Sequence, residues 1–337
     1  MSVAMNRWGL RLSDTLRETL RRGDLTAAAQ LVEHGDGMAR SLAKEFNMMY
    51  RGLGITIRVM LESLAGLAAD TGAGAALAAH CVRFATDMNR LMHAAWDAPL
   101  APAPSSPSAS EAAALVVAVL AAGEADFERV HADNAGATLV AIEAEDADAA
   151  IALVTRKVEA LYLPLHDRLV RFMADSMAFA LTHGGDDGLF RFQMETAAGQ
   201  RAGFDKWERM SAAEFAQASA FLLKMHMGEV TVTEDDQRFT LHQKLCGSGG
   251  RLRTMGAYEG PDALPFVEQA GPLTFGQPRL PVYCSHCPIW NGTATLRWYG
   301  RVHWLFEGAA RADGSCTAHI YKRRADQPEV LVAPLRA

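Results

Sequence analysis

The stretch Val230-Thr-Val-Thr-Glu-Asp-Asp-Gln-Arg-Phe-Thr-Leu-His-Gln-Lys-Leu-Cys246 marks a change of pattern in this chain. Apolar and polar residues alternate on both sides of the acidic turn 234–236, which is typical of a β-hairpin. Before Val230 the apolar residues recur with a helical period instead. The sequence therefore predicts an α+β fold: a mainly helical first two-thirds, followed by a small antiparallel β-rich, metal-binding module.

Cysteines are concentrated in the β-rich part. Cys246 ends the second strand of the predicted hairpin, Cys284 and Cys287 form a Cys-x-x-Cys motif before Pro288, and Cys316 begins a predicted final strand. This spacing lets two thiolates bind one metal ion, and a third and fourth ligand complete tetrahedral zinc coordination. We therefore predict a Zn²⁺ site formed by Cys246, Cys284, Cys287 and Cys316.

The fourth ligand stays open at this stage. Besides Cys316, the candidates are His286, His242, His319 and water, and His242 can take part only if its strand bends, because four extended residues span about 13 Å. Four protein ligands predict a structural ion, whereas an open position predicts a catalytic one. Iron–sulfur proteins supply their cysteines in tighter clusters, which favours zinc.

A redox dithiol is a further interpretation of the Cys-x-x-Cys motif. Such motifs normally open a helix, whose N-terminus lowers the thiol pKa. The residues after Cys287 do not predict a helix, since segments 293–300 and 302–306 have strand-like alternation. This weakens the redox interpretation relative to the metal site.

Two classes of function follow from these residues. One is a zinc-dependent enzyme of hydrolytic or lyase type, acting on a small molecule between the helical and β-rich parts. Arg251 or Arg253 would then hold an anionic group, and His286 or His166 would move protons. The other is a ligand-binding or protein-interaction protein with a structural zinc ion. His166 lies on an apolar helix face, which also fits a hydrogen-bonded core residue.

The helical part contains a linker and an internal similarity. Pro99-Leu-Ala-Pro-Ala-Pro-Ser-Ser-Pro-Ser-Ala-Ser110 is typical of an extended linker. We predict a helical region at 1–98, the linker at 99–110, a second helical region at 111–228 and the β-rich cysteine domain at 229–337. Placing Asp24 over Asp146 predicts a duplicated helical unit, because it aligns Leu20 with Ile142, Ala28 with Ala150, Leu31 with Leu153 and Val32 with Val154.

Bulk composition limits the partners. The net charge of −6 gives no basic face for nucleic acid, and no long uncharged apolar run predicts a membrane span. The beginning of the chain lacks the features of a secretory signal, so we expect a cytoplasmic protein with reduced thiols. The expected partner is a small molecule, and a homodimer is compatible with the sequence.

Overall fold

The computed structural model describes residues 5–100 and 104–336, and these divide into two compact units. Residues 10–55 and 74–170 form the helical unit. Residues 5–9, 56–73 and 171–336 form the sheet unit. Both units therefore combine segments that are far apart in the sequence.

The helical unit contains five complete helices and parts of two others. The complete helices are α1 (Leu12–Arg21), α2 (Leu25–His34), α4 (Gly74–Trp96), α5 (Ala109–Glu143) and α6 (Ala147–Arg156). Helices α3 (Asn47–Thr71) and α7 (Leu163–Gly199) contribute residues to both units. A π-helical segment, Lys157–Tyr162, joins α6 to α7. The predicted linker falls between α4 and α5 in the sequence, and its residues 101–103 lie outside the described residues.

Two helical hairpins in this unit have matching turns. The side chain of Asp24 caps α2 by accepting a hydrogen bond from the amide three residues on, at 3.0 Å. Asp146 caps α6 in the same way at 2.9 Å. The residue before each cap, Gly23 or Glu145, has a positive φ, of 75° and 56° respectively. The two turns therefore have the same local geometry.

The aligned apolar residues of the two hairpins also share one core. This core contains three of the aligned pairs in buried positions: Leu20 and Ile142, Ala28 and Ala150, and Val32 and Val154. Burial of both members of each pair is what a pseudo-symmetric packing of two related hairpins requires. The duplication itself stays a prediction, which these contacts support.

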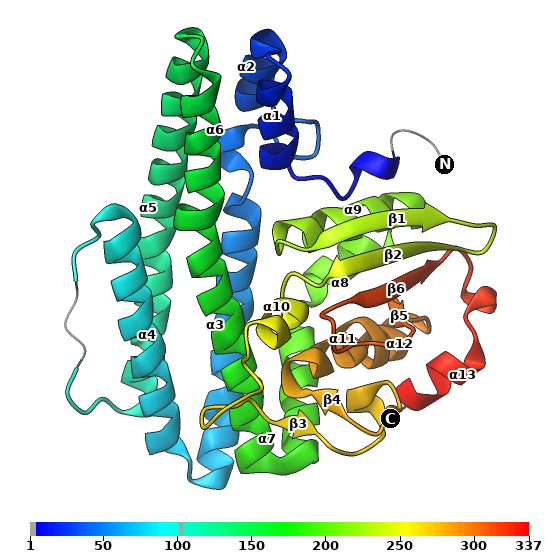
Figure 1. Ribbon diagram of the computed structural model, residues 1–337. Coiled ribbons are helices and arrows are strands. Elements are labelled where there is room, and N and C mark those ends of the chain that lie inside the picture. The colour runs from blue at the N-terminus through cyan, green and yellow to red at the C-terminus, as the bar shows by residue number, and fades with distance from the viewer. Residues whose placement is uncertain (1–4, 101–103, 337) are drawn as a thin grey trace. The chain divides into compact units, whose positions relative to one another are not determined.

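The sheet unit contains a four-stranded antiparallel sheet in the order β1-β2-β6-β5 (Figure 1). The strands are β1 (Glu229–Glu234), β2 (Arg238–Leu245), β5 (Leu305–Phe306) and β6 (Cys316–Tyr321), and a separate pair is formed by β3 (Phe266–Val267) and β4 (Leu280–Pro281). The helices are α8 (Arg201–Glu208), α9 (Ala212–Met225), α10 (Gly249–Thr254), α11 (His286–Pro288), α12 (Ala294–Tyr299) and α13 (Glu329–Val332). The prediction of helices followed by a small antiparallel sheet is confirmed.

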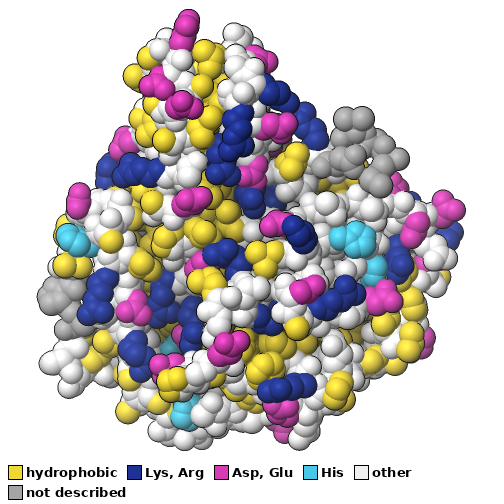
Figure 2. Space-filling model, viewed as in Figure 1, with side chains coloured by type: hydrophobic (Ala, Val, Ile, Leu, Met, Phe, Trp, Pro, Cys, Tyr) yellow, Lys and Arg dark blue, Asp and Glu magenta, His cyan; other side chains and the backbone are white. Residues whose placement is uncertain are grey.

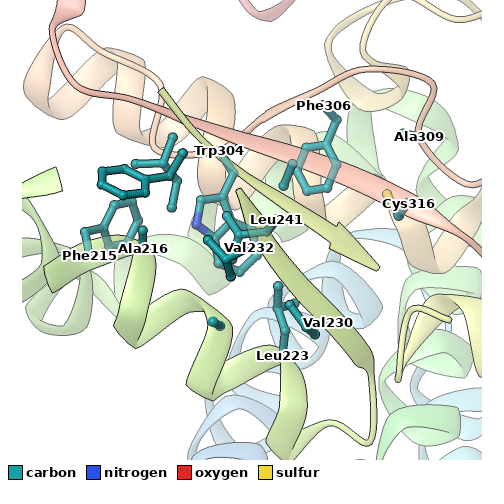
Figure 3. Close-up of a cluster of buried hydrophobic side chains, with 14 of the residues drawn as sticks. Phe215, Ala216, Leu223, Val230, Val232, Leu241, Trp304, Phe306, Ala309 and Cys316 are labelled. Atoms are coloured by element: carbon teal, nitrogen blue, oxygen red, sulfur yellow. The ribbon is translucent and has the colours of Figure 1, made fainter. Parts of the chain in front are cut away.

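Helix α9 packs against one face of this sheet. A serine followed by glutamate three residues on predicts a capping box, and α9 begins with one: the Ser211 hydroxyl accepts from the Glu214 amide at 3.3 Å. Apolar side chains of α9 contact alternate residues of the strands, and Cys316 belongs to the same cluster (Figure 3). The sheet core therefore reaches one of the four cysteines directly.

Two predictions of local structure need correction. Segment 293–300 was expected to be a strand, but it contains helix α12, which ends at Gly300 with φ 70°. Buried Thr295 fits a helix because its hydroxyl donates to the carbonyl oxygen of Asn291 at 2.8 Å. The glycines and aspartates of segment 183–188 are typical of a loop between helices, but the segment is helical within α7 except at Gly185, whose φ of 63° and ψ of −164° interrupt the helix.

One segment, Leu42–Thr71, is long and apolar enough to cross a membrane by length and composition alone. Within its most apolar window 56% of the residues are buried in the protein, as in the core helix of a globular fold. Charged side chains of both signs are interspersed on the face shown in Figure 2.

Candidate metal centre

Three segments of the sheet unit carry the four cysteines. Cys246 directly follows β2, Cys284 and Cys287 lie in the helical turns at residues 282–288, and Cys316 is the first residue of β6. Cys316 is buried in the sheet core, and the other three are partly buried against the same cluster. All four cysteines that the sequence nominated therefore belong to, or pack against, one apolar cluster.

The glycines after Cys246 permit this arrangement. A Cβ atom on Gly249 would lie 2.9 Å from the sulfur of Cys284, which is closer than side-chain atoms approach one another. A Cβ on Gly250 would collide with the carbonyl oxygen of Gly314 and lie 3.0 Å from the Cβ of Cys246. A loop with few side chains can let its backbone approach a ligand, and here the glycines bring the backbone close to the cysteine segments.

The thiol pKa values show that the cysteines affect one another electrostatically. The pKa of Cys284 is raised to about 12, chiefly by burial; Arg253 opposes this shift, and the charges of Cys246 and Cys316 contribute to it. Burial also raises the pKa of Cys287, followed by the effects of the same three cysteines. For Cys316, burial and then Cys246 raise the pKa to about 11. Without a bound cation the buried thiols are therefore protonated at neutral pH.

The charge of Arg253 lowers the pKa of three of these thiols, those of Cys284, Cys287 and Cys316, and so opposes the effect of burial. Its Nη1 donates to the sulfur of Cys284 at 3.2 Å and to the carbonyl oxygen of Gly249 at 3.0 Å. Its Nε and Nη2 atoms are buried and have no hydrogen-bond partner among the described residues. These two nitrogens form the edge of the guanidinium that binds anions in a bidentate manner. The sequence offered Arg253 only as an alternative to Arg251.

A further buried polar atom beside Cys316 also has no partner in the described part of the chain. It is Oε1 of Gln243, which pairs with Cys316 across the strands; the hydroxyl of Ser315, by contrast, interacts with the carboxylate of Asp313. Buried polar atoms in proteins are nearly always hydrogen-bonded, to protein, water or a bound group. Unpartnered buried atoms occur in several parts of the described chain, and those of Arg253 and Gln243 are the ones near the cysteines.

His286 is positioned between its neighbours by its ring nitrogens. Nδ1 lies 2.5 Å from the carbonyl oxygen of Tyr283, so Nδ1 carries the proton, and Nε2 faces the sulfur of Cys287 at 3.5 Å. Burial lowers the pKa of His286 to about 4. The neutral imidazole therefore accepts a hydrogen bond from the Cys287 thiol.

The other candidate ligands have different surroundings. His242 is exposed on the far side of a regular stretch of β2, where its Nε2 lies 3.4 Å from the hydroxyl of Thr233. His319 is engaged with Thr240 at 3.1 Å and with Glu307 at 3.2 Å. Neither contacts a cysteine sulfur in these interactions, which favours Cys316 as the fourth ligand.

The other two predicted catalytic residues are His166 and Arg251, and the backbone amide of Arg251 donates to the carbonyl oxygen of Cys246 at 3.0 Å. His166 belongs to the helical unit, where it is fully buried and its Nδ1 is 3.0 Å from a carboxylate oxygen of Asp167. It thus has the hydrogen-bonded core environment considered above. Arg251 lies on α10, and its Nη2 is 3.8 Å from the sulfur of Met255.

Within residues 5–100 and 104–336, no group of three or more His, Cys, Asp and Glu side chains is already arranged around a common metal position. Binding of an ion would therefore involve movement of the cysteine side chains. Comparison of the chain with known protein families, curated proteins and solved structures gives no match.

Proposed function

We propose that Cys246, Cys284, Cys287 and Cys316 bind one zinc ion. The observation that carries this proposal is that four cysteines from three segments belong to one cluster beside Arg253. Four sulfur ligands provide the tetrahedral coordination typical of structural zinc. When bound, the ion would supply a crosslink between the end of β2, the turns at 282–288 and the start of β6, and would contribute to the stability of the sheet unit.

The charge of Arg253 supports this donor set. Next to protonated thiols, its buried Nε and Nη2 atoms have neither a hydrogen bond nor a described carboxylate partner, which is an unfavourable state for a buried cation. Zinc with four thiolates carries an excess of negative charge. Arg253 would then donate hydrogen bonds to sulfur and compensate part of that charge, as residues around metal ligands commonly do.

The raised thiol pKa values set the conditions for binding. Each buried thiol must lose its proton to become a ligand, so metal binding releases protons and its apparent affinity rises with pH. The affinity rises rather than falls with pH because the pKa values of Cys284 and Cys316, about 12 and about 11, lie above neutrality in the metal-free protein.

A catalytic zinc ion is the second candidate. It requires that water replace one sulfur, and the observation that favours it is the unpartnered Nε–Nη2 edge of Arg253. That edge would hold an anionic group of a small molecule, while His286 would exchange a proton beside the ion. Hydrolytic and lyase-type reactions both fit this chemistry.

Metal analysis and cobalt substitution test the two candidates. The reduced protein is expected to contain about one zinc per chain, and the double variant Cys284→Ser, Cys287→Ser is expected to lose it. Replacement of zinc by Co²⁺ would produce sulfur-to-cobalt charge-transfer absorption whose intensity follows the number of thiolates. Cys81→Ala, in the helical unit, is the matched control because Cys81 is buried away from the cluster.

The variant Cys316→Ser separates a structural from a catalytic ion. Loss of about a quarter of the charge-transfer intensity, together with lower stability of the sheet unit, would support four sulfur ligands. Unchanged intensity would mean three sulfurs and an open position. A reduced protein that binds no stoichiometric zinc, or a brown protein with iron–sulfur absorption, would refute the proposal.

A further inference from the structure

The Cys-x-x-Cys motif lies in a helical backbone, although the sequence did not predict a helix there. Helical turns follow one another from Val282 to Tyr299 as 3-10, α, π and α segments. The two residues between the cysteines, Ser285 and His286, have φ and ψ of −65°, −16° and −68°, −32°. Positions three apart in such a backbone have Cβ atoms about 5–6 Å apart on one face.

This spacing is close to that of a disulfide. Cβ atoms joined by a disulfide are about 3.5–4.5 Å apart, so those of Cys284 and Cys287 must approach by about 1–2 Å to form one. The two thiols already influence each other, since the charge of Cys284 raises the pKa of Cys287 after the larger effect of burial. The helical turns at 282–288 thus meet one requirement of redox chemistry at this motif, a helical backbone.

These two sulfurs are more accessible than two of the other cysteines. Cys246, Cys284 and Cys287 are partly exposed, whereas Cys316 is 8% exposed and Cys81 is fully buried; of the three exposed cysteines, only Cys284 and Cys287 lie three residues apart. Arg253 Nη1, at 3.2 Å from the sulfur of Cys284, stabilises the thiolate that attacks an oxidant. The geometry therefore marks Cys284 as the attacking sulfur and Cys287 as its partner.

We propose that Cys284 and Cys287 form a reversible disulfide that expels the bound metal ion when the protein meets a hydroperoxide. The Cys284 thiolate attacks the peroxide oxygen, which gives a sulfenic acid and releases one water after protonation. Cys287 then attacks that sulfur, the S–S bond forms, and the sulfenic oxygen leaves as a second water. Two sulfurs lose two electrons in total, and one hydrogen peroxide takes up these electrons and two protons.

Loss of the metal follows from the number of ligands that remain. After oxidation only Cys246 and Cys316 still offer thiolates, which is half of a zinc site. A dithiol reductant reverses the reaction by thiol–disulfide exchange and restores the site. This inference rests on the proposed zinc site for the metal release, but the disulfide itself requires only the geometry of residues 284–287.

The test uses the full chain, loaded with zinc and then treated with hydrogen peroxide. We expect complete release of the zinc, measured with a metallochromic dye, together with the loss of two hydrogen atoms by intact mass. Peptide mapping is expected to link Cys284 to Cys287. Dithiothreitol and zinc should return both signals to their starting values.

Two variants keep the result interpretable. Cys316→Ser retains the reactive pair and should still form the disulfide, whereas Cys287→Ser should form none. Linkage of Cys246 to Cys316 in place of the expected pair, or zinc release without any disulfide, would overturn the inference. If the protein binds no zinc but still forms the Cys284–Cys287 disulfide, the zinc site is refuted and the disulfide stands. If zinc binds and peroxide leaves it bound, the zinc site stands and this inference is refuted.

Discussion

The helical unit contains a buried ion pair between Lys157 and Glu45, and the stability of the unit should depend on it. Both side chains are fully buried, and Nζ lies 3.4 Å from a carboxylate oxygen of Glu45. The other carboxylate oxygen accepts the amide of Ser13 at 2.9 Å, in the first turn of α1. Nζ also lies 4.1 Å from the centre of the Phe46 ring. The pair therefore ties α1 and the turn before α3 to the π-helical segment that Lys157 begins.

The attraction between the two charges follows from this geometry. Two unit charges 3.4 Å apart attract each other by about 5 kcal/mol at an effective dielectric constant of about 20. Much of this gain offsets the cost of removing both groups from water. Removing one partner leaves the other charge buried, and such changes typically cost about 3–5 kcal/mol.

We therefore expect Lys157→Met to lower the free energy of unfolding by about 3–5 kcal/mol, because the buried carboxylate of Glu45 then keeps only the Ser13 amide. The double variant Lys157→Met, Glu45→Gln should recover a large part of the loss, since no buried charge remains. Arg129→Met is the matched control: Arg129 pairs with Asp126 at 3.1 Å on the surface, so its loss should cost less than about 1 kcal/mol.

The pH dependence of the pair has a definite sign. Burial lowers the pKa of Lys157 from 10.5 to about 8, and Glu45 opposes this shift. Between these values the unfolded chain binds more protons than the folded protein, so stability rises with pH by up to about 3 kcal/mol. Lys157→Met lacks this titrating group, and its difference from the wild type should grow between pH 8 and 10.

Urea unfolding followed by circular dichroism at pH 7 and pH 9.5 measures these changes. Hydrogen exchange of peptides from α5 and α6 assigns them to the helical unit. A loss below about 1 kcal/mol for Lys157→Met, or a double variant as unstable as the sum of the single ones, would refute the reasoning.

Three other predictions concern the glycine loop, the matching hairpins and the sheet. Gly249→Ala should weaken zinc binding and lower stability by about 1–3 kcal/mol, because its Cβ would press on the sulfur of Cys284; isothermal titration and thermal unfolding measure this, and unchanged affinity would contradict it. Asp24→Ala and Asp146→Ala should each cost about 1 kcal/mol in urea unfolding, and a clear difference between the two would argue against equivalent hairpins. Trp304→Phe should lower stability by about 1–3 kcal/mol, because its Nε1 donates to buried Ser219 at 3.0 Å and the hydroxyl would lose this partner.

Local signals in the sequence predicted several elements correctly. Ser211 and Glu214 begin α9, and alternation before and after the turn 234–236 predicts β1 and β2. In each case the decisive interaction lies within a few residues or between neighbouring strands. Such features depend little on the rest of the fold.

The error at segment 293–300 has a tertiary cause. Threonine, tryptophan and tyrosine in alternation favour a strand, yet Ala294 and Thr295 are both buried in a continuous helical run. Gly300 in the left-handed region is a C-terminal helix signal that the alternation obscured. Burial of successive residues on different faces is incompatible with a half-exposed strand, but the sequence alone does not reveal it.

The cysteine cluster shows where sequence reasoning could succeed and where it could not. Counting and spacing sufficed to nominate the four cysteines, because few other residues form soft metal sites.

The role of Arg253 depends on the strand order β1-β2-β6-β5, which brings the end of β2 and the start of β6 to the same end of the sheet. The backbone amide of Cys246 then donates to the carbonyl oxygen of Gly314 at 3.0 Å. Helix α10 begins three residues after Cys246, so this pairing also fixes where the helix carrying Arg253 starts. Arg253 rather than Arg251 reaches Cys284 because the two residues lie about 200° apart around that helix. A change in strand order would move this cation away from the sulfurs, so the chemistry of the site is a consequence of the topology as much as of the motif.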